Sequence, residues 1–126
     1  MIIGIGIDLC SVERMREQMD NARFQARIFT QKERAYFASR PAVAATSLAA
    51  GFAAKEAFLK AVGLGLGGMA MTDIEVLHKE SGQPYYVLHG LADQWMQSRG
   101  AVAHLSLTHE NGMAAAFCVI EGSQTA

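Results

Sequence analysis

The amino-acid sequence predicts an α+β fold in which an antiparallel sheet packs on one long central helix. The helix is predicted from residues 42–63, which contain no proline and are rich in alanine and larger apolar side chains. The sheet is predicted from segments on both sides of that helix whose apolar residues alternate with period two. The last two of these segments flank Asn111-Gly112, the strongest hairpin signal in the chain.

The chain of 126 residues is long enough for one domain with a hydrophobic core. We expect that domain to cover residues 1–122 and residues 123–126 to form a flexible tail. Hydrophobic residues make up 51% and charged residues 18%, which is typical of a soluble globular protein with a slight apolar excess. That excess favours a subunit interface.

Two features indicate a cytoplasmic location. No apolar run reaches the length of a membrane span, and the N-terminus lacks the basic region of a signal peptide. Cys10 and Cys118 have no motif spacing, so we expect reduced core residues rather than a disulfide.

The basic residues are concentrated in one segment. Between Arg14 and Arg40 there are seven basic and three acidic residues, so this segment carries +4 whereas the whole chain carries −1. Two interpretations remain open, a solvated helical face and a docking surface for an acidic partner. Nucleic acid is the less favoured partner because the segment lacks aromatic residues at a stacking spacing.

The first predicted element is a strand over residues 2–8. One face carries only isoleucines: Ile3, Ile5 and Ile7. The other carries Gly4, Gly6 and Asp8, and glycines in a strand mark close approach by another backbone or a ligand. Ser11 is the better cap for the next helix, which leaves Asp8 without a structural role. The Asp8 carboxylate is therefore a candidate site residue.

Three short helices are expected next. The first spans Val12 to about Asp20, the second runs through Ile28, and the third extends from the capping box of Thr30 and Glu33 to about Ser39. The Arg40-Pro41 pair ends the third helix, and proline suits the first turn of the central helix that follows.

The central helix carries three charges: Lys55, Glu56 and Lys60. Glu56 and Lys60 share one face with Phe52, and one interpretation is a stabilising pair worth about 0.3–0.5 kcal/mol. However, a helix that is apolar around most of its circumference is usually buried. Buried charges are costly unless they pair with each other, a metal or an anionic ligand, so these charges predict a site.

The helix ends at Gly63, and a glycine-rich segment follows over residues 63–68. This segment ends a helix rather than opening one, so Walker-type and dinucleotide-binding motifs are excluded.

The second half of the chain is predicted to contain two hairpins and a helix. Residues 73–79 and 84–89 form the first hairpin around Ser81-Gly82, residues 91–98 form a helix, and residues 102–110 and 113–121 form the second hairpin. Leu105, Leu107 and His109 share one strand face. A lone histidine at a strand end is more often structural than functional.

Residue patterns alone therefore indicate magnesium-dependent phosphoryl chemistry. Asp8 and Glu56 supply two carboxylates, Lys60 a cation and the glycine-rich segment backbone amides. Magnesium typically takes one or two carboxylates and fills its remaining positions with water and substrate oxygens. Such a set suits Mg²⁺ that holds a phosphate or pyrophosphate.

Three motifs carry a resemblance to a known family: Gly4-Ile-Gly-Ile-Asp8, Phe52-Ala-Ala-Lys-Glu-Ala-Phe-Leu-Lys60 and Gly63-Leu-Gly65. At this separation they resemble the holo-(acyl-carrier-protein) synthase family, the small 4′-phosphopantetheinyl transferases. Gly82-Gln-Pro84 and Leu105-Ser-Leu-Thr-His109 also fit, so the resemblance covers nearly the whole chain.

The resemblance implies a reaction in which the phosphopantetheine arm of coenzyme A moves to a serine of apo-acyl carrier protein, releasing adenosine 3′,5′-bisphosphate. It implies that Asp8 and Glu56 bind Mg²⁺ and that Lys60 offsets charge as the phosphoanhydride breaks. Three further residues are implied at the coenzyme: Gly63, Gly65 and His109. The general base stays open among Glu56, a water held by the metal and a substrate group.

The resemblance also implies a trimer with each site at a subunit interface. It further implies that the helix that begins near Arg14 receives the acidic carrier protein. One position departs from the family. Members commonly carry a basic residue, usually arginine, immediately before Phe52 to hold a coenzyme phosphate, and here that position is Gly51.

Two other classes of function stay open. A magnesium-dependent nucleotide hydrolase would need no acceptor protein, and a non-catalytic module that binds acyl carrier protein would not need Asp8 or Glu56. Whether the carrier serves fatty-acid or secondary-metabolite synthesis is also open.

Overall fold

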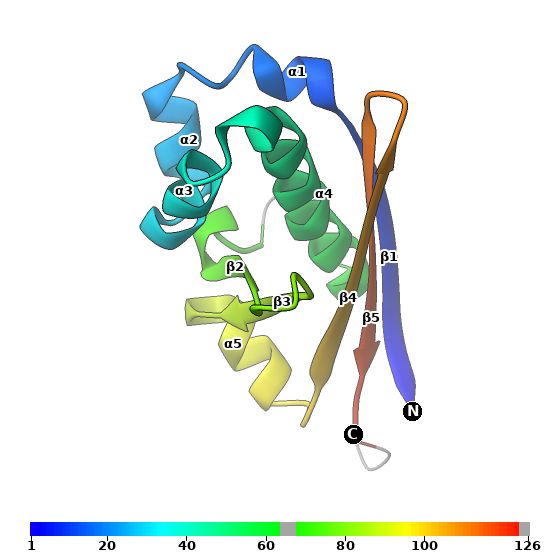
Figure 1. Ribbon diagram of the computed structural model, residues 1–126. Helices are drawn as coiled ribbons and strands as arrows, with labels where there is room; N and C mark the ends of the chain where they lie inside the picture. Colours follow the sequence, from blue (N-terminus) through cyan, green and yellow to red (C-terminus); the bar gives the residue numbers. More distant parts are fainter. Residues whose placement is uncertain (64–67, 124–126) are drawn as a thin grey trace.

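The fold is built on a three-stranded antiparallel sheet with the order β1-β5-β4 (Figure 1). The structure is a computed structural model and describes residues 1–63 and 68–123. Its strands are β1 (Ile2–Ser11), β4 (Val102–Glu110) and β5 (Met113–Glu121). A separate hairpin pairs β2 (Ile74–His78) with β3 (Pro84–Leu88). The α+β class is confirmed, with the antiparallel strands divided between two sheets.

The turn between β4 and β5 has the conformation that its residues favour. Asn111 and Gly112 have φ angles of 51° and 75°, as a type I′ hairpin turn requires. The two strands have the bounds expected from the sequence, and their register places Leu107 opposite Ala116.

The long helix α4 (Ala44–Val62) lies across one face of this sheet, after a short 3-10 turn, η1 (Pro41–Val43). The helix ends at Gly63, whose φ of 81° is left-handed and whose N–H bonds to the carbonyls of Leu59 and Lys60. A Cβ at Gly4 or Gly6 would collide with a backbone carbonyl of α4. The predicted close approach on this face of β1 is therefore made by helix backbone.

The length and apolar character of helix α4 differ from the expectation that no apolar segment is as long as a membrane span. The helical stretch Pro41–Val62 is long and apolar enough to cross a membrane by length and composition alone, contrary to the sequence analysis. In the structure 61% of its 18-residue apolar window is buried. The physical reason for its apolar character is that the sheet and the short helices cover it on most sides.

The short helices before α4 are α1 (Val12–Arg16), α2 (Ala22–Ile28) and α3 (Gln31–Ala38). Ser11, Asn21 and Thr30 cap them, and Thr30 forms the expected capping box with Glu33. Helix α1 ends earlier than expected. The Gln25 side chain donates to the carbonyls of Gln18 and Met19, so these carbonyls belong to a turn instead of a longer helix.

The opposite face of the three-stranded sheet is bare within the described chain, because every other element lies on the α4 side (Figure 1). These elements include α5 (Gly90–Gln97) and a 3-10 turn, η3 (Met71–Asp73). The bare face carries large apolar side chains with high exposed fractions: Ile5 61%, Ile7 63%, Leu9 64% and Phe117 44%. Ile5 and Ile7 therefore point away from the core, whereas Ile3, at a register shift in β1, is partly buried and packs against it. Cys10 and Cys118 are buried and free, as expected.

Candidate functional site

Two of the predicted site residues meet at the edge of the sheet. Asp8 lies on the face of β1 that α4 covers, and Lys60 lies in the last turn of α4. The Lys60 ammonium is 3.1 Å from Asp8 Oδ1 and also donates to the Ile7 carbonyl at 2.9 Å. Asp8 is mostly buried whereas the Lys60 side chain is half exposed, so the pair sits at a surface that a ligand can reach.

Glu56 completes a carboxylate pair with Asp8. Partial burial raises the pKa of Glu56, the negative charge of Asp8 raises it further, and Lys60 opposes both effects. In the described part of the chain, Lys60 makes its ion pair with Asp8 and not with Glu56. Glu56 and Lys60 thus interact through their charges without a direct ion pair among the described residues, since the Lys60 ammonium is bound by Asp8.

Burial is the main cause of the raised pKa of Glu56, and the charge of Asp8 adds to it although Lys60 lies nearby. Carboxylate oxygens are the ligands that Mg²⁺ prefers, and it needs only one or two of them from a protein. Among the described residues there is no group of three or more metal-ligating side chains. The donor set thus fits a cation that takes its remaining ligands from water and substrate.

The third charge of the helix, Lys55, belongs elsewhere. It is fully buried, and its ammonium donates to Glu33 Oε1 at 2.9 Å and to the carbonyls of Met71 and Ile74 at 3.0 and 2.6 Å. Successive helical residues point about 100° apart. Lys55 therefore faces α3 and β2 while Glu56 faces the edge of the sheet. The sequence predicted that all three charges are buried and belong to one site. Only Glu56 and Lys60 lie in the candidate site, and both are at least partly exposed.

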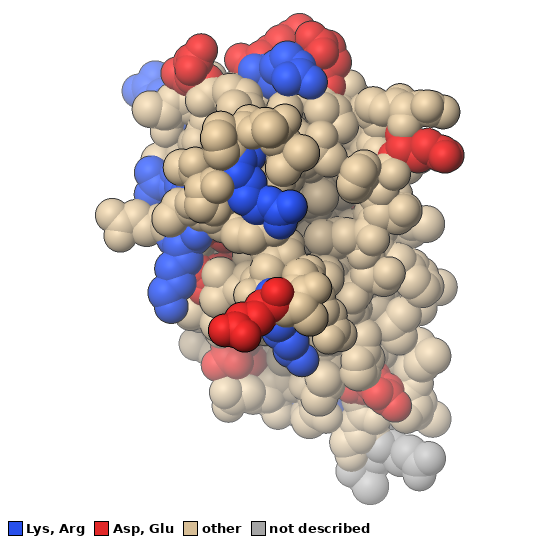
Figure 2. Space-filling model, viewed as in Figure 1, with Lys and Arg blue, Asp and Glu red and all other residues tan. Residues whose placement is uncertain are grey.

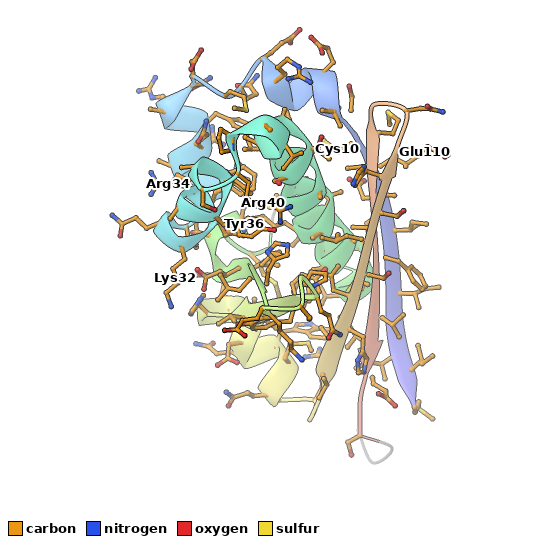
Figure 3. The ribbon with its side chains drawn as sticks, in the orientation of Figure 1. Cys10, Lys32, Arg34, Tyr36, Arg40 and Glu110 are labelled. Carbon is orange, nitrogen blue, oxygen red and sulfur yellow. The ribbon has the colours of Figure 1, made fainter. Side chains whose placement is uncertain are left out.

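A cavity of about 310 Å³ lies beyond the opposite flank of α4. Its polar and aromatic wall is formed by Tyr36, Arg40, His78 and His109. Arg40 Nη1 donates to the Tyr36 hydroxyl at 2.8 Å, and the two side chains lie next to each other in Figure 3. The Tyr36 ring stacks on His78 at a centroid distance of 4.1 Å. A cation beside stacked rings suits a ligand with an anionic group and an aromatic ring.

Sequence reasoning did not identify Tyr36, Arg40 and His78 as site residues. Arg40 carried one signal, its place at the end of the basic segment. The pKa of His78 is lowered by burial and by the charge of Arg40, which shows that these side chains are close although 38 residues separate them. Gly51 lines the same cavity, and a Cβ there would make ordinary contacts with Phe29 and Phe37.

The predicted site residues are thus divided between two places in one chain. Asp8 lies on β1 and His109 on β4, and these are the two edge strands with β5 between them. The cavity is lined by His109 but not by Asp8, Glu56 or Lys60. Gly63 follows Lys60 at the end of α4, and Gly65 lies outside the described residues.

The basic segment is exposed on the short helices. Arg14 lies on α1, three residues after its cap Ser11 and exposed to solvent. Figure 2 shows several blue side chains over the half of this view formed by the short helices, whereas the flank formed by the sheet is mostly tan. Lys32 and Arg34 point outward from α3 (Figure 3).

Known proteins resemble this chain over almost its whole length. The family model described as the 4′-phosphopantetheinyl transferase superfamily matches residues 4–118. A holo-(acyl-carrier-protein) synthase of Treponema denticola is 44% identical over 97% of this chain and 100% of its own length. One of Acidovorax sp. is 44% identical over 96% of this chain and 98% of its own.

Solved structures give the same likeness. A holo-(acyl-carrier-protein) synthase of Bacillus anthracis in complex with CoA (3′,5′-ADP) has a TM-score of 0.82 and 34% identity over 98% of this chain and 99% of that one. The synthase of Neisseria meningitidis has a TM-score of 0.84 and 35% identity over 96% and 99% of the two chains.

Proposed function

This chain belongs to the holo-(acyl-carrier-protein) synthase family of the 4′-phosphopantetheinyl transferase superfamily, and we propose that it moves the 4′-phosphopantetheine group of coenzyme A to a serine of an apo-acyl carrier protein, releasing adenosine 3′,5′-bisphosphate. The observation that carries this proposal is the cluster of Asp8, Glu56 and Lys60. Two motifs far apart in the sequence supply these residues, and they lie together at an accessible edge of the fold. Residues 1–122 of each copy would form the single domain of the enzyme, which would be cytoplasmic.

Asp8 and Glu56 would hold Mg²⁺. When bound, this ion would supply positive charge that binds and polarises the coenzyme pyrophosphate. The two carboxylates support this role because burial and the charge of Asp8 both raise the pKa of Glu56, and a bound cation would stabilise its ionised form. Neither carboxylate is needed to cap a helix, since Ser11 caps α1.

Lys60 would act on the phosphate where the bond breaks. Its ammonium is held by Asp8 and by the Ile7 carbonyl, so it is positioned before substrate arrives. A fixed positive charge stabilises the negative charge that develops on the leaving bisphosphate. The half-exposed Lys60 side chain is reachable by a ligand without any change of fold. Gly63, directly after this turn, leaves its surroundings open for a close approach by the coenzyme, and we extend that role to Gly65.

The cavity with Arg40 and His109 would receive the nucleotide end of coenzyme A. Arg40 offers a charge-assisted hydrogen bond to a phosphate, and the stacked rings of Tyr36 and His78 offer a face for adenine. Because this cavity and the carboxylate cluster lie at opposite edges of the sheet in one chain, each complete site would combine two copies.

A homotrimer would supply those copies. The bare sheet face with Ile5, Ile7, Leu9 and Phe117 is the apolar surface that such an assembly would cover. Sedimentation of the purified protein at micromolar concentration tests this part, and a fully active monomer would exclude it.

The exposed basic residues, beginning with Arg14 on α1, would bind the acidic carrier protein. Opposite charge on the two partners speeds encounter and fixes orientation. Nothing in this role requires nucleic acid or a membrane.

Intact mass spectrometry of an apo-carrier protein incubated with this protein, coenzyme A and Mg²⁺ tests the proposal. We expect the carrier to gain the mass of one phosphopantetheine group. Bisphosphate release without that gain would favour a nucleotide hydrolase. A stable complex with neither product would favour a non-catalytic carrier-binding module.

A further inference from the structure

The buried ion pair between Lys55 and Glu33 has no part in the reaction described above, although Lys55 lies inside the helix motif beside Glu56. Lys55 is 0% exposed and Glu33 is 2% exposed, and their charged atoms are 2.9 Å apart. Pairs this deeply buried add little net stability compared with apolar side chains of the same size. Their presence therefore calls for a reason other than stability.

Glu33 joins two elements through its two carboxylate oxygens. Its Oε1 accepts from the Thr30 amide at 2.8 Å and so closes the first turn of α3, and its Oε2 accepts from the Val76 amide at 2.9 Å in the middle of β2. One side chain thus fixes the distance between α3 and β2.

Lys55 adds the third element. Its ammonium reaches from α4 to Glu33 on α3, to the Met71 carbonyl in η3 and to the Ile74 carbonyl at the start of β2. All three acceptors are satisfied at once, so Lys55 fixes α4 relative to the other two elements. Burial lowers the pKa of Lys55, and the carboxylate of Glu33 opposes that shift.

These same three elements form part of the wall of the 310 Å³ cavity, which residues of β3 and β4 complete. Glu33 and Val76 line it directly, α3 carries Tyr36, β2 ends at His78, and α4 contributes Gly51. The stacking of Tyr36 on His78 at 4.1 Å depends on the distance between α3 and β2, which is the distance that Glu33 sets.

We propose that Glu33 and Lys55 are positioning residues for this cavity: Glu33 fixes α3 to β2, and Lys55 fixes both to α4. They act through Tyr36, Arg40 and His78 and do not touch the ligand's reacting atoms. The name of the ligand, coenzyme A, rests on the proposed function, whereas the link between the ion pair and the cavity rests on the geometry alone.

Glu33→Gln is the sharpest test because it is isosteric and leaves Lys55 two carbonyl acceptors. Glutamine offers one acceptor oxygen instead of two, so it cannot hold the Val76 amide and the Lys55 ammonium together. We expect the KM for coenzyme A to rise about tenfold while kcat changes less than about twofold, since small misplacements of binding groups cost about this much or more. Stabilisation by Mg²⁺, measured as a shift in Tm, should be unchanged.

The double variant Lys55→Met with Glu33→Gln removes both charges and leaves no unpaired charge in the core. It should fold and show the same rise in KM. Met96→Ala on α5 is the control for a simple loss of stability, because Met96 is buried but does not line the cavity. It should lower Tm and leave the KM unchanged.

An unchanged KM in both folded variants, or an equal rise in Met96→Ala, would overturn the inference. Calorimetric binding of adenosine 3′,5′-bisphosphate separates this inference from the proposed function. If the wild type transfers nothing but binds the bisphosphate, and Glu33→Gln weakens that binding, the proposed function fails and the inference stands. If the wild type transfers normally and Glu33→Gln binds the bisphosphate equally well, the inference alone fails.

Discussion

The Lys60 ammonium lies 3.1 Å from Asp8 Oδ1, so the last turn of α4 is tied to β1 at the place where we propose the chemistry occurs. The two residues are 52 positions apart in the chain. Their contact depends on Gly4 and Gly6, which have no Cβ to hold the helix away from the strand. Gly4 and Gly6 therefore contribute to the site through packing, because they let α4 lie close enough to β1 for Lys60 to contact Asp8.

The first prediction is that both carboxylates are required for transfer. Asp8→Asn and Glu56→Gln should each lower the rate of carrier modification by about 10²–10³-fold or more while the fold remains intact. Mg²⁺ at a hundred times its dissociation constant should stabilise the wild type by about 2.7 kcal/mol and neither variant. Mass spectrometry and thermal melts measure the two effects. Glu80→Gln, at the exposed turn after β2, is the matched control.

The second prediction concerns pH and stability without metal. The pKa of Glu56 is raised above its ordinary 4.5, so the folded state binds this proton more tightly than the unfolded chain. Stability contributed by Glu56 is therefore lost as the pH rises from that ordinary value through the raised one. Glu56→Gln should raise Tm at neutral pH and have no such effect below about pH 4. Equal Tm values for the two proteins at neutral pH would contradict the prediction.

The third prediction is that Arg14 contributes to carrier binding by charge. Arg14→Glu should raise the KM for the carrier about fivefold at low salt and flatten its dependence on ionic strength. The KM for coenzyme A should change little. Lys79→Glu, exposed after β2 and away from α1, is the control. If Arg14→Glu behaves like that control, Arg14 belongs to a solvated face.

The fourth prediction concerns the departure at Gly51. A charge-assisted hydrogen bond is worth about 1.5–3 kcal/mol, so Gly51→Arg should lower the KM for coenzyme A by about ten- to a hundredfold. The KM for 3′-dephospho-coenzyme A should change little. A Cβ at position 51 would make ordinary van der Waals contacts, none closer than 3.4 Å, with Phe29 and Phe37. Gly51→Ala, which adds helix propensity without charge, is the control. An equal effect of arginine on both substrates would mean that the glycine serves packing alone.

The fifth prediction is that the bare sheet face assembles the enzyme. Phe117 is 44% exposed in one chain, so Phe117→Asp should leave the monomer folded. A buried, unpaired carboxylate should prevent association, and transfer should be lost with it if each site combines two copies. Sedimentation and activity measured on the same sample check this. Phe117→Leu keeps the face apolar and should remain assembled and active.

The elements that the sequence determined by itself each have a local cause. Asn111-Gly112 favours a type I′ turn, Thr30 and Glu33 cap a helix within four residues, and Gly63 ends α4 because it adopts a left-handed φ. Asp8, Glu56 and Lys60 could be selected as candidates because a charged residue among apolar neighbours can be recognised from the sequence alone.

Only the tertiary structure decided what these residues contact. Period two shows that β1 has two faces, but the packing of α4 decides that the face with Gly4 and Gly6 is covered while Ile5 and Ile7 stay exposed. Lys55 and Glu56 are neighbours in the sequence. In the folded chain Lys55 binds Glu33, whereas Glu56 lies near Asp8. The cavity of Arg40, Tyr36 and His78 had no sequence signature as a group. Contacts between distant residues depend on how whole faces of helices and strands pack together. The periodicity of one segment shows which of its faces is apolar, but it does not specify which other element packs on that face.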